Sequence, residues 1–166
     1  SFNVPTGSFA YTDGNARTLV TSGNRTDGGP ARSGNQRSLN AATTGLFGVT
    51  QTIYASVLWQ NLGNLILKGS GAGGLNISAG ANSASAALRA SLGDIDGSSS
   101  ETAYGPAAPY GTPVFLGIRI DNVAGGTETV TVAVNPDLSD PNWSAAGTWS
   151  VSGKDIGVPT LVEVNT

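Results

Sequence analysis

Residues 114–134 read VFLGIRIDNVAGGTETVTVAV and contain two runs in which every second residue is aliphatic. The shared-parity residues are Val114, Leu116, Ile118 and Ile120 in the first run, and Val130, Val132 and Val134 in the second. Alternate side chains of a strand point to opposite faces, so each run predicts a strand with one buried face. The turn residues 121–126 between the runs predict a β-hairpin. Pro136 has no N–H to donate, so we expect the second strand to end at Asn135.

Shorter alternating runs at 8–12, 46–60, 65–69, 74–80 and 87–93 extend this pattern over much of the chain. In the strongest of them, 46–60, we expect Ile53, Val57 and Trp59 to face the core. Short strands between Gly-rich turns are typical of sandwiches and barrels, whereas residues 83–92 are too short and too Gly-bounded to predict an independent helix. We therefore predict an all-β protein: an antiparallel β-sandwich of jelly-roll type, with residues 1–166 forming a single domain and 17–37 a long loop.

Composition excludes several classes of partner. The chain has 166 residues, a net charge of −3 and only 11% charged residues, so it lacks the basic surface that nucleic acids and anionic membranes require. No run approaches the length of a membrane-spanning helix. The chain has no Met and begins SFNVP, which indicates a processed chain, and we expect a secreted, extracellular or cell-surface protein. Removal of a tag from a recombinant chain is the alternative explanation.

Catalysis is not expected, because the chain contains neither His nor Cys. Without them a Ser-His-Asp triad or a zinc site cannot be built. Hydrolysis of a glycosidic bond by two carboxylates would still be chemically open. Nearly all acidic residues, however, adjoin Gly, Pro, Asn or Ser and are typical of turns. We predict that the protein is not an enzyme.

The segment GDIDGSSSE, residues 93–101, contains the only metal-site candidate that we retain. Asp94, Asp96 and Glu101 offer the hard oxygen ligands that calcium prefers. The spacing does not match an EF-hand. The alternative is that these side chains accept hydrogen bonds from the backbone of an exposed turn, with no cofactor bound.

Three aromatic residues lie where they could contact a sugar. Trp143 falls in a Pro-bounded segment, and Tyr104 and Tyr110 flank the sequence GPAAP. The apolar face of a pyranose ring packs on an aromatic ring, so these positions predict an extracellular glycan as a ligand. Packing against the ends of a sandwich is the alternative role.

In the C-terminal segment, residues 158–166, apolar residues alternate with polar ones. The apolar residues are Val158, then either Leu161 or Val162, and then Val164. A strand at the end of a chain either pairs within its own sheet or offers unpaired backbone groups to a neighbour. Its low charge favours pairing between copies. We therefore expect residues 1–12 and 158–166 to mediate a homo-oligomer or filament, because a heterologous contact that does not close produces a fibre.

The sequences YASVLWQ, TPVFLGIRIDNVAGGTETVTVAVNPD, DPNW and GSFAYTDGNARTLVTSGN together resemble the LamG-like, concanavalin A-like jelly-roll domains of secreted bacterial proteins, often those with C-terminal sorting signals. The resemblance implies a jelly roll and, by analogy with lectins, a glycan ligand. Ala133 stands where that family commonly has an aromatic, which removes one sugar-stacking position. Two functions follow: a non-catalytic secreted structural module that self-assembles through its terminal strands, or a glycan-binding module of a cell-surface protein.

Overall fold

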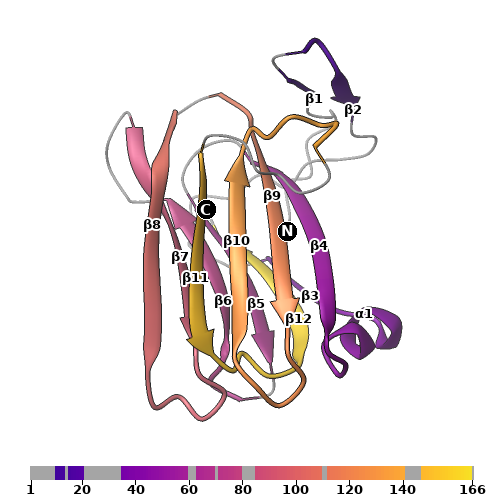
Figure 1. Cartoon of the computed structure of the whole chain (residues 1–166), viewed down its shortest axis with the longest axis vertical. Helices are drawn as coiled ribbons and strands as arrows, with labels where there is room; N and C mark the ends of the chain where they lie inside the picture. Colours follow the sequence, from indigo (N-terminus) through magenta and orange to yellow (C-terminus); the bar gives the residue numbers. More distant parts are fainter. Residues whose placement is uncertain are drawn as a thin grey trace.

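The computed structural model describes residues 10–13, 15–20, 35–59, 63–69, 71–79, 85–109, 112–140 and 147–165. Within these ranges the chain is nearly all β-structure, and two antiparallel sheets pack face to face (Figure 1). The prediction of an all-β antiparallel sandwich is confirmed. The jelly-roll type and the single-domain extent stay predictions.

The smaller sheet has four strands in the order β11-β10-β9-β4. Its strands are β4 (Gln51–Trp59), β9 (Val114–Asn122), β10 (Glu128–Val134) and β11 (Thr148–Lys154). The hairpin predicted from residues 114–134 is confirmed as β9 and β10, which pair antiparallel. Asn135 leaves β10 with a positive φ of 48°, directly before Pro136. The chain therefore leaves the sheet at Asn135, as the position of Pro136 led us to expect.

The larger sheet has six strands in the order β3-β12-β5-β6-β7-β8. Its strands are β3 (Asn35–Ser38), β5 (Asn64–Gly69), β6 (Gly74–Ala79), β7 (Ser85–Gly93), β8 (Ser100–Pro109) and β12 (Pro159–Asn165). Strands β5 to β8 form a meander, in which each strand pairs with the next. The strand β8 was not predicted. The loop predicted over 17–37 is wrong in part, because it contains β2 (Thr18–Val20) and most of β3.

The core lies between the two sheets. Every predicted inward residue whose side chain the structure describes is either fully buried or partly buried against the core; the side chain of Trp59 lies outside the described ones. The larger sheet contributes a second set of fully buried residues, namely Leu75, Ile77, Leu88, Ala90 and Leu92. Parity therefore identified the inner face of the hairpin and of β4 correctly.

The C-terminal strand β12 is an interior strand. It pairs with β5 on one side and with β3 on the other, and its partners in β5 include Leu67 for Val162 and Leu65 for Val164. Of the two alternatives for a terminal strand, closure of its own sheet is correct. The expectation of an open strand edge is therefore wrong for Leu161, Val162 and Val164, because both sides of β12 already have partners. Val158 precedes the strand and is 39% exposed. The role of these four residues in self-association stays a prediction.

A short helix, α1 (Ala41–Leu46), precedes β4 and was not predicted from the sequence. Its first turn is capped by Asn40, whose side-chain oxygen accepts a hydrogen bond from the N–H of Thr43 at 2.8 Å. A helix of six residues is too short to be predicted from the sequence composition. Figure 1 shows it beside the lower end of β4.

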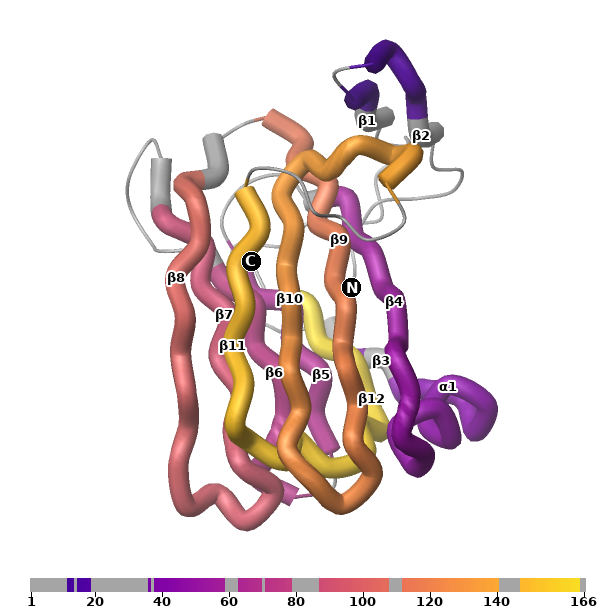
Figure 2. The backbone as a smooth tube through the Cα atoms, viewed as in Figure 1, coloured from indigo at the N-terminus to yellow at the C-terminus, as the bar shows by residue number. Residues whose placement is uncertain are grey.

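The strands β1 (Ala10–Thr12) and β2 (Thr18–Val20) form a separate two-stranded hairpin, which Figure 2 shows above the end of the sandwich. Residues 8–12 were predicted as a strand, and the described part of that run is β1. The turn after β1 is tied to the β10–β11 connection by Asp13, whose carboxylate accepts the N–H of Arg17 at 2.8 Å and of Leu138 at 3.1 Å. Arg17 also forms an ion pair with Asp137 at 3.0 Å.

Candidate functional site

The outer face of the six-stranded sheet is polar along almost its whole width. Strand pairing aligns Tyr104, Arg89, Ser78 and Asn64 in one row of neighbouring strands. The adjacent row contains Thr102, Ser91, Asn76, Ile66, Glu163 and Gln36. We call the described polar side chains of these two rows, together with Lys68, the polar face: Gln36, Asn64, Lys68, Asn76, Ser78, Arg89, Ser91, Thr102, Tyr104 and Glu163.

The polar face arises because β6 and β7 alternate between apolar and polar residues. Leu75 and Ile77 of β6 point into the core, so Asn76 and Ser78 between them point outward. The same alternation holds in β7, where Arg89 and Ser91 lie between buried residues. Antiparallel pairing then brings the outward residues of neighbouring strands side by side.

Hydrogen bonds fix most of these side chains in place. The Nε of Arg89 donates to the Oγ of Ser78 at 2.6 Å, and Ser78 is only 1% exposed. The hydroxyls of Ser91 and Thr102 share a hydrogen bond at 2.8 Å. Arg89 and Thr102 are exposed and are held in place by these bonds, whereas Ser78 supports Arg89 and is itself buried.

Glu163 forms the second anchored group on the polar face. Its Oε2 accepts hydrogen bonds from the Nζ of Lys68 at 2.7 Å and from the Nε2 of Gln36 at 2.6 Å. Glu163 is 7% exposed, and such a buried carboxylate needs partners of this kind. The charge of Lys68 is thereby neutralised within the face.

One acceptor of the polar face has no partner. The Oδ1 of Asn76 is buried and makes no hydrogen bond. An unsatisfied buried polar group costs about 1–3 kcal/mol, so native proteins rarely leave one unpaired without a bound water or a functional reason. Asn76 lies between Ile66 and Ser91 in its row, in the middle of the sheet.

Tyr104 stands at the β8 end of the polar face and is 70% exposed. Directly beyond it the pairing of β7 and β8 is irregular: Arg89 pairs with Tyr104 but Ala87 pairs with Ala107, so β8 contains an extra residue. Such β-bulges re-aim neighbouring side chains and are common next to binding sites. The bulge lies at Gly105 and Pro106, immediately after the tyrosine.

The predicted glycan residues are placed as follows. Tyr104 lies on the outer face of the larger sheet opposite Arg89. Trp143 and Tyr110 lie outside the described residues, so nothing places them relative to Tyr104. Sequence reasoning missed Arg89, Asn76 and Ser91, although the alternation in 74–80 and 87–93 was the signal that could have found them.

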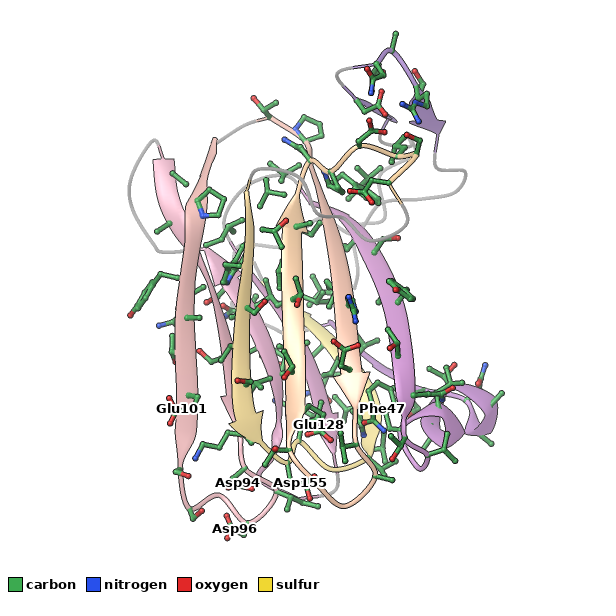
Figure 3. All side chains as sticks on the ribbon, viewed as in Figure 1. Phe47, Asp94, Asp96, Glu101, Glu128 and Asp155 are labelled. Atoms are coloured by element: carbon green, nitrogen blue, oxygen red, sulfur yellow. The ribbon has the colours of Figure 1, made fainter. Side chains whose placement is uncertain are left out.

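The predicted calcium residues lie at the foot of the sandwich (Figure 3). The Oδ1 of Asp94 accepts the N–H of Ile95 at 3.1 Å, and the Oδ1 of Asp96 accepts the N–H of Ser98 at 2.7 Å. Hydrogen bonds from the hydroxyl and the N–H of Ser98 lower the pKa of Asp96. In the described part of the chain no three acidic side chains are arranged to hold a metal ion. The geometry therefore favours the turn interpretation for these carboxylates.

Glu128 is a buried carboxylate that the sequence did not single out. It is 2% exposed at the start of β10, and its Oε2 accepts the N–H of Ile156 at 2.8 Å. Burial raises the pKa of Glu128 above its ordinary value, and the nearby Asp155 carboxylate adds to the rise. Because its described partner is a backbone group of the β11–β12 connection, we interpret Glu128 as a structural tie.

Comparison with models of protein families, with curated proteins and with solved structures gave no match to this chain. The resemblance to LamG-like domains therefore stays a prediction. Among the described residues, no helix is both long enough and apolar enough to cross a membrane.

Proposed function

We propose that the protein is a non-catalytic, extracellular glycan-binding module and that the polar face is its binding surface. The observation that carries the proposal is the exposed ring of Tyr104 beside Arg89, at the end of a surface of ordered hydroxyl, amide and charged side chains. With the C-terminal strand closed into its own sheet, self-assembly through that strand has lost its support.

The chemistry of the polar face suits a polyhydroxylated ligand. A sugar ring presents an apolar face that packs on an aromatic ring, and its hydroxyls both donate and accept hydrogen bonds. Tyr104 offers the ring, and the hydroxyls of Ser91 and Thr102 lie in the adjacent row. A bulge fixes the backbone beside the tyrosine, and rigid supports of this kind favour specific binding.

Replacing Tyr104 by Ala tests the proposal. We expect affinity for a bound oligosaccharide to fall about 3- to 10-fold, since an aromatic contact contributes about 0.5–1.5 kcal/mol beyond area burial. Tyr54→Ala is the matched control, because Tyr54 is an exposed tyrosine as well but lies on β4 of the other sheet. Calorimetry with cello-, xylo- and galacturono-oligosaccharides measures both. Equal losses in the two variants, or no binding by the wild type, would contradict the proposal.

A second candidate function is pairing with another copy of the chain, and the edge strand β4 favours it. β4 has nine residues with no charge and no proline, and its register with β9 is uninterrupted. In the described part of the chain no strand pairs with its other side. The other described edges are shorter or protected: β3 has four residues, β8 contains Pro106, and β11 lies alongside β8.

The direction of the backbone groups in β4 follows from its neighbour. The C=O of Phe115 accepts the N–H of Asn135 at 2.8 Å, and the N–H of Phe115 donates to the side-chain Oδ1 of Asn135 at 2.9 Å. The backbone groups of Phe115 therefore face β10, and those of Leu116 face β4. Leu116 pairs with Val57, whose groups therefore face β9. The N–H and C=O of Ser56 and Leu58 consequently point away from the sheet, where a second strand would bind.

Sedimentation of Ser56→Lys tests this second candidate. A lysine at the edge disfavours strand pairing, so we expect the variant to stay monomeric at concentrations at which the wild type forms dimers. Ser152→Lys on β11 is the control, since it adds the same charge to an exposed position of the same sheet. A wild type that stays monomeric throughout would remove this candidate and leave glycan binding untouched.

A further inference from the structure

Arg89 is anchored but not neutralised. Its Nε donates to the buried Oγ of Ser78 at 2.6 Å, which fixes one edge of the guanidinium group. A guanidinium has five N–H donors, so the terminal nitrogens retain four beyond this bond. Arg89 itself is exposed on β7, and the neighbour across from it on β8 is Tyr104.

Three other described cations have carboxylate partners, and Lys154, on β11 of the other sheet, donates instead to the hydroxyl of Ser99 at 2.6 Å. Lys68 pairs with Glu163 at 2.7 Å, Arg119 with Asp121 at 3.0 Å, and Arg17 with Asp137 at 3.0 Å. Within the part of the chain that the structure describes, no such pair involves Arg89. The polar face therefore has one positive charge that its own residues do not compensate, next to its one exposed aromatic ring.

We propose that the polar face takes a carboxylated sugar, such as a uronic acid residue, whose ring packs on Tyr104 while its carboxylate binds the guanidinium of Arg89. This inference rests on the proposed glycan-binding function and names its ligand class. Tyr104 is the neighbour of Arg89 on β8, whereas Ser78, which holds the guanidinium, is its neighbour on β6. The ligand must therefore extend from Tyr104 across β7 to reach the terminal nitrogens of Arg89. A planar guanidinium binds a carboxylate through two parallel hydrogen bonds, which a neutral sugar cannot offer.

The rest of the molecule does not attract anions, since the chain has a net charge of −3. The preference for an acidic sugar must therefore come from the local contact with Arg89 and not from long-range attraction. Because the guanidinium is exposed, salt should weaken the contact without abolishing it. A sulfate ester could also form two hydrogen bonds with a guanidinium, so a sulfated oligosaccharide is compared with the uronate in the test.

The test compares short oligogalacturonate chains with the same chains after complete methyl esterification, which removes the charge and retains the sugar. We expect the wild type to bind the acid form about 10-fold tighter, as charge-assisted hydrogen bonds contribute about 1.5–3 kcal/mol. Arg89→Gln should reduce affinity for the acid form to the level of the ester. Arg119→Gln, which removes an arginine from the other sheet, should keep the preference. Circular dichroism verifies that both variants fold.

The outcomes separate the two proposals. Equal binding of acid and ester by the wild type would overturn the inference about Arg89 and leave glycan binding in place. Binding of neither form, nor of any neutral oligosaccharide, would overturn both. Tighter binding of a sulfated oligosaccharide than of the uronate would overturn the assignment of a carboxylate. Loss of the preference in Arg119→Gln would also overturn it, because the discriminating charge would then lie on the other sheet.

Discussion

Gly105 of β8 lies against the indole ring of Trp149 of β11, so close that a Cβ at position 105 would overlap the ring. Trp149 is partly buried and packs against the hydrophobic core, and its Nε1 is buried without a hydrogen-bond partner. The contact joins the two sheets along one side of the sandwich, where β8 and β11 lie side by side (Figure 2). Gly105 is part of the bulge and directly follows Tyr104. A shift of Trp149 in the core would therefore move the backbone beside the proposed binding surface.

Gly105→Ala should therefore destabilise the protein. An added methyl group must displace Trp149 or β8, and overpacking of this kind costs about 1–3 kcal/mol. Urea denaturation followed by Trp fluorescence measures the loss. We also expect weaker saccharide binding, because any shift of β8 moves Tyr104.

Gly45→Ala is the control for that experiment. Gly45 lies in α1, and a Cβ there would meet no atom within 4 Å. Alanine in place of glycine within a helix stabilises by about 0.5–1 kcal/mol, so the control should be neutral or slightly more stable. A Gly105→Ala variant as stable as Gly45→Ala would show that the contact with Trp149 does not constrain β8.

Glu128 should make the protein less stable as pH rises. Its folded-state pKa lies above the ordinary value of 4.5, because burial disfavours the charged form and Asp155 repels it. As pH rises through 4.5 the unfolded chain loses this proton first, so the folded state loses stability until the folded pKa is passed. Below 4.5 both states are protonated and the contribution is fully present.

The neutral variant Glu128→Gln tests this sign. We expect the free energy of unfolding of the wild type, relative to Glu128→Gln, to decrease over a range of pH that begins near the ordinary value of 4.5 and extends upward from it. Thermal unfolding across that range gives the difference. A difference that increases with pH would mean that the charged carboxylate is the form that the fold favours.

The β1–β2 hairpin should detach from the sandwich at acid pH. Burial opposes ionisation of Asp13, but N–H groups of Arg17, Leu138 and Asn15, together with the charge of Arg17, outweigh it and lower the pKa of this carboxyl. The stabilising contribution is therefore present above 3.8 and is lost as pH falls through the lower folded pKa. Hydrogen exchange should show earlier acid-induced opening in β1 and β2 than in β9 and β10.

Asp13→Ala should reproduce that opening at neutral pH, because it removes the acceptor of three backbone N–H groups. Asp96→Ala removes another carboxylate with a lowered pKa, at the opposite end of the sandwich, and should leave the hairpin amides unchanged. Exchange rates in β1 and β2 that are the same in both variants would contradict the role of Asp13.

Calcium should not stabilise the protein. The carboxylates of Asp94 and Asp96 already accept backbone hydrogen bonds of their own turn, and Glu101 lies farther along on β8. A ligand that binds the folded state raises the melting temperature by mass action, so equal values in calcium, magnesium and chelator are expected. A calcium-specific rise that disappears in Asp96→Ala would restore the metal interpretation.

Strands with a clear local alternation of apolar and polar residues were predicted from the sequence. Features that depend on pairing with distant strands were missed. The hairpin β9–β10 was predicted correctly because seven aliphatic residues share its inner face. The strand β8 was missed because Gly105, Pro106 and Pro109 are typical of loops, although an edge strand with a bulge tolerates them. The position of β12 was also missed, because its partner β5 is distant in the chain.

The polar face could be predicted only in part. Alternation shows that Asn76, Ser78, Arg89 and Ser91 point away from the core, but not which of them are neighbours across strands. That alignment depends on register, and the irregularity between β7 and β8 sets the pairing of Arg89 with Tyr104. No local signal in the sequence gives the position of such a bulge.

The most direct test of the account follows the protein by NMR during titration with cello-, xylo- and galacturono-oligosaccharides. We predict that at least one of them shifts the backbone amides of β7 and β8 and the Nε–H resonance of Arg89, while the amides of β9 and β10 stay in place. If none of these saccharides shifts the protein resonances, or if the shifts fall on the four-stranded sheet, the polar face is not a glycan-binding surface.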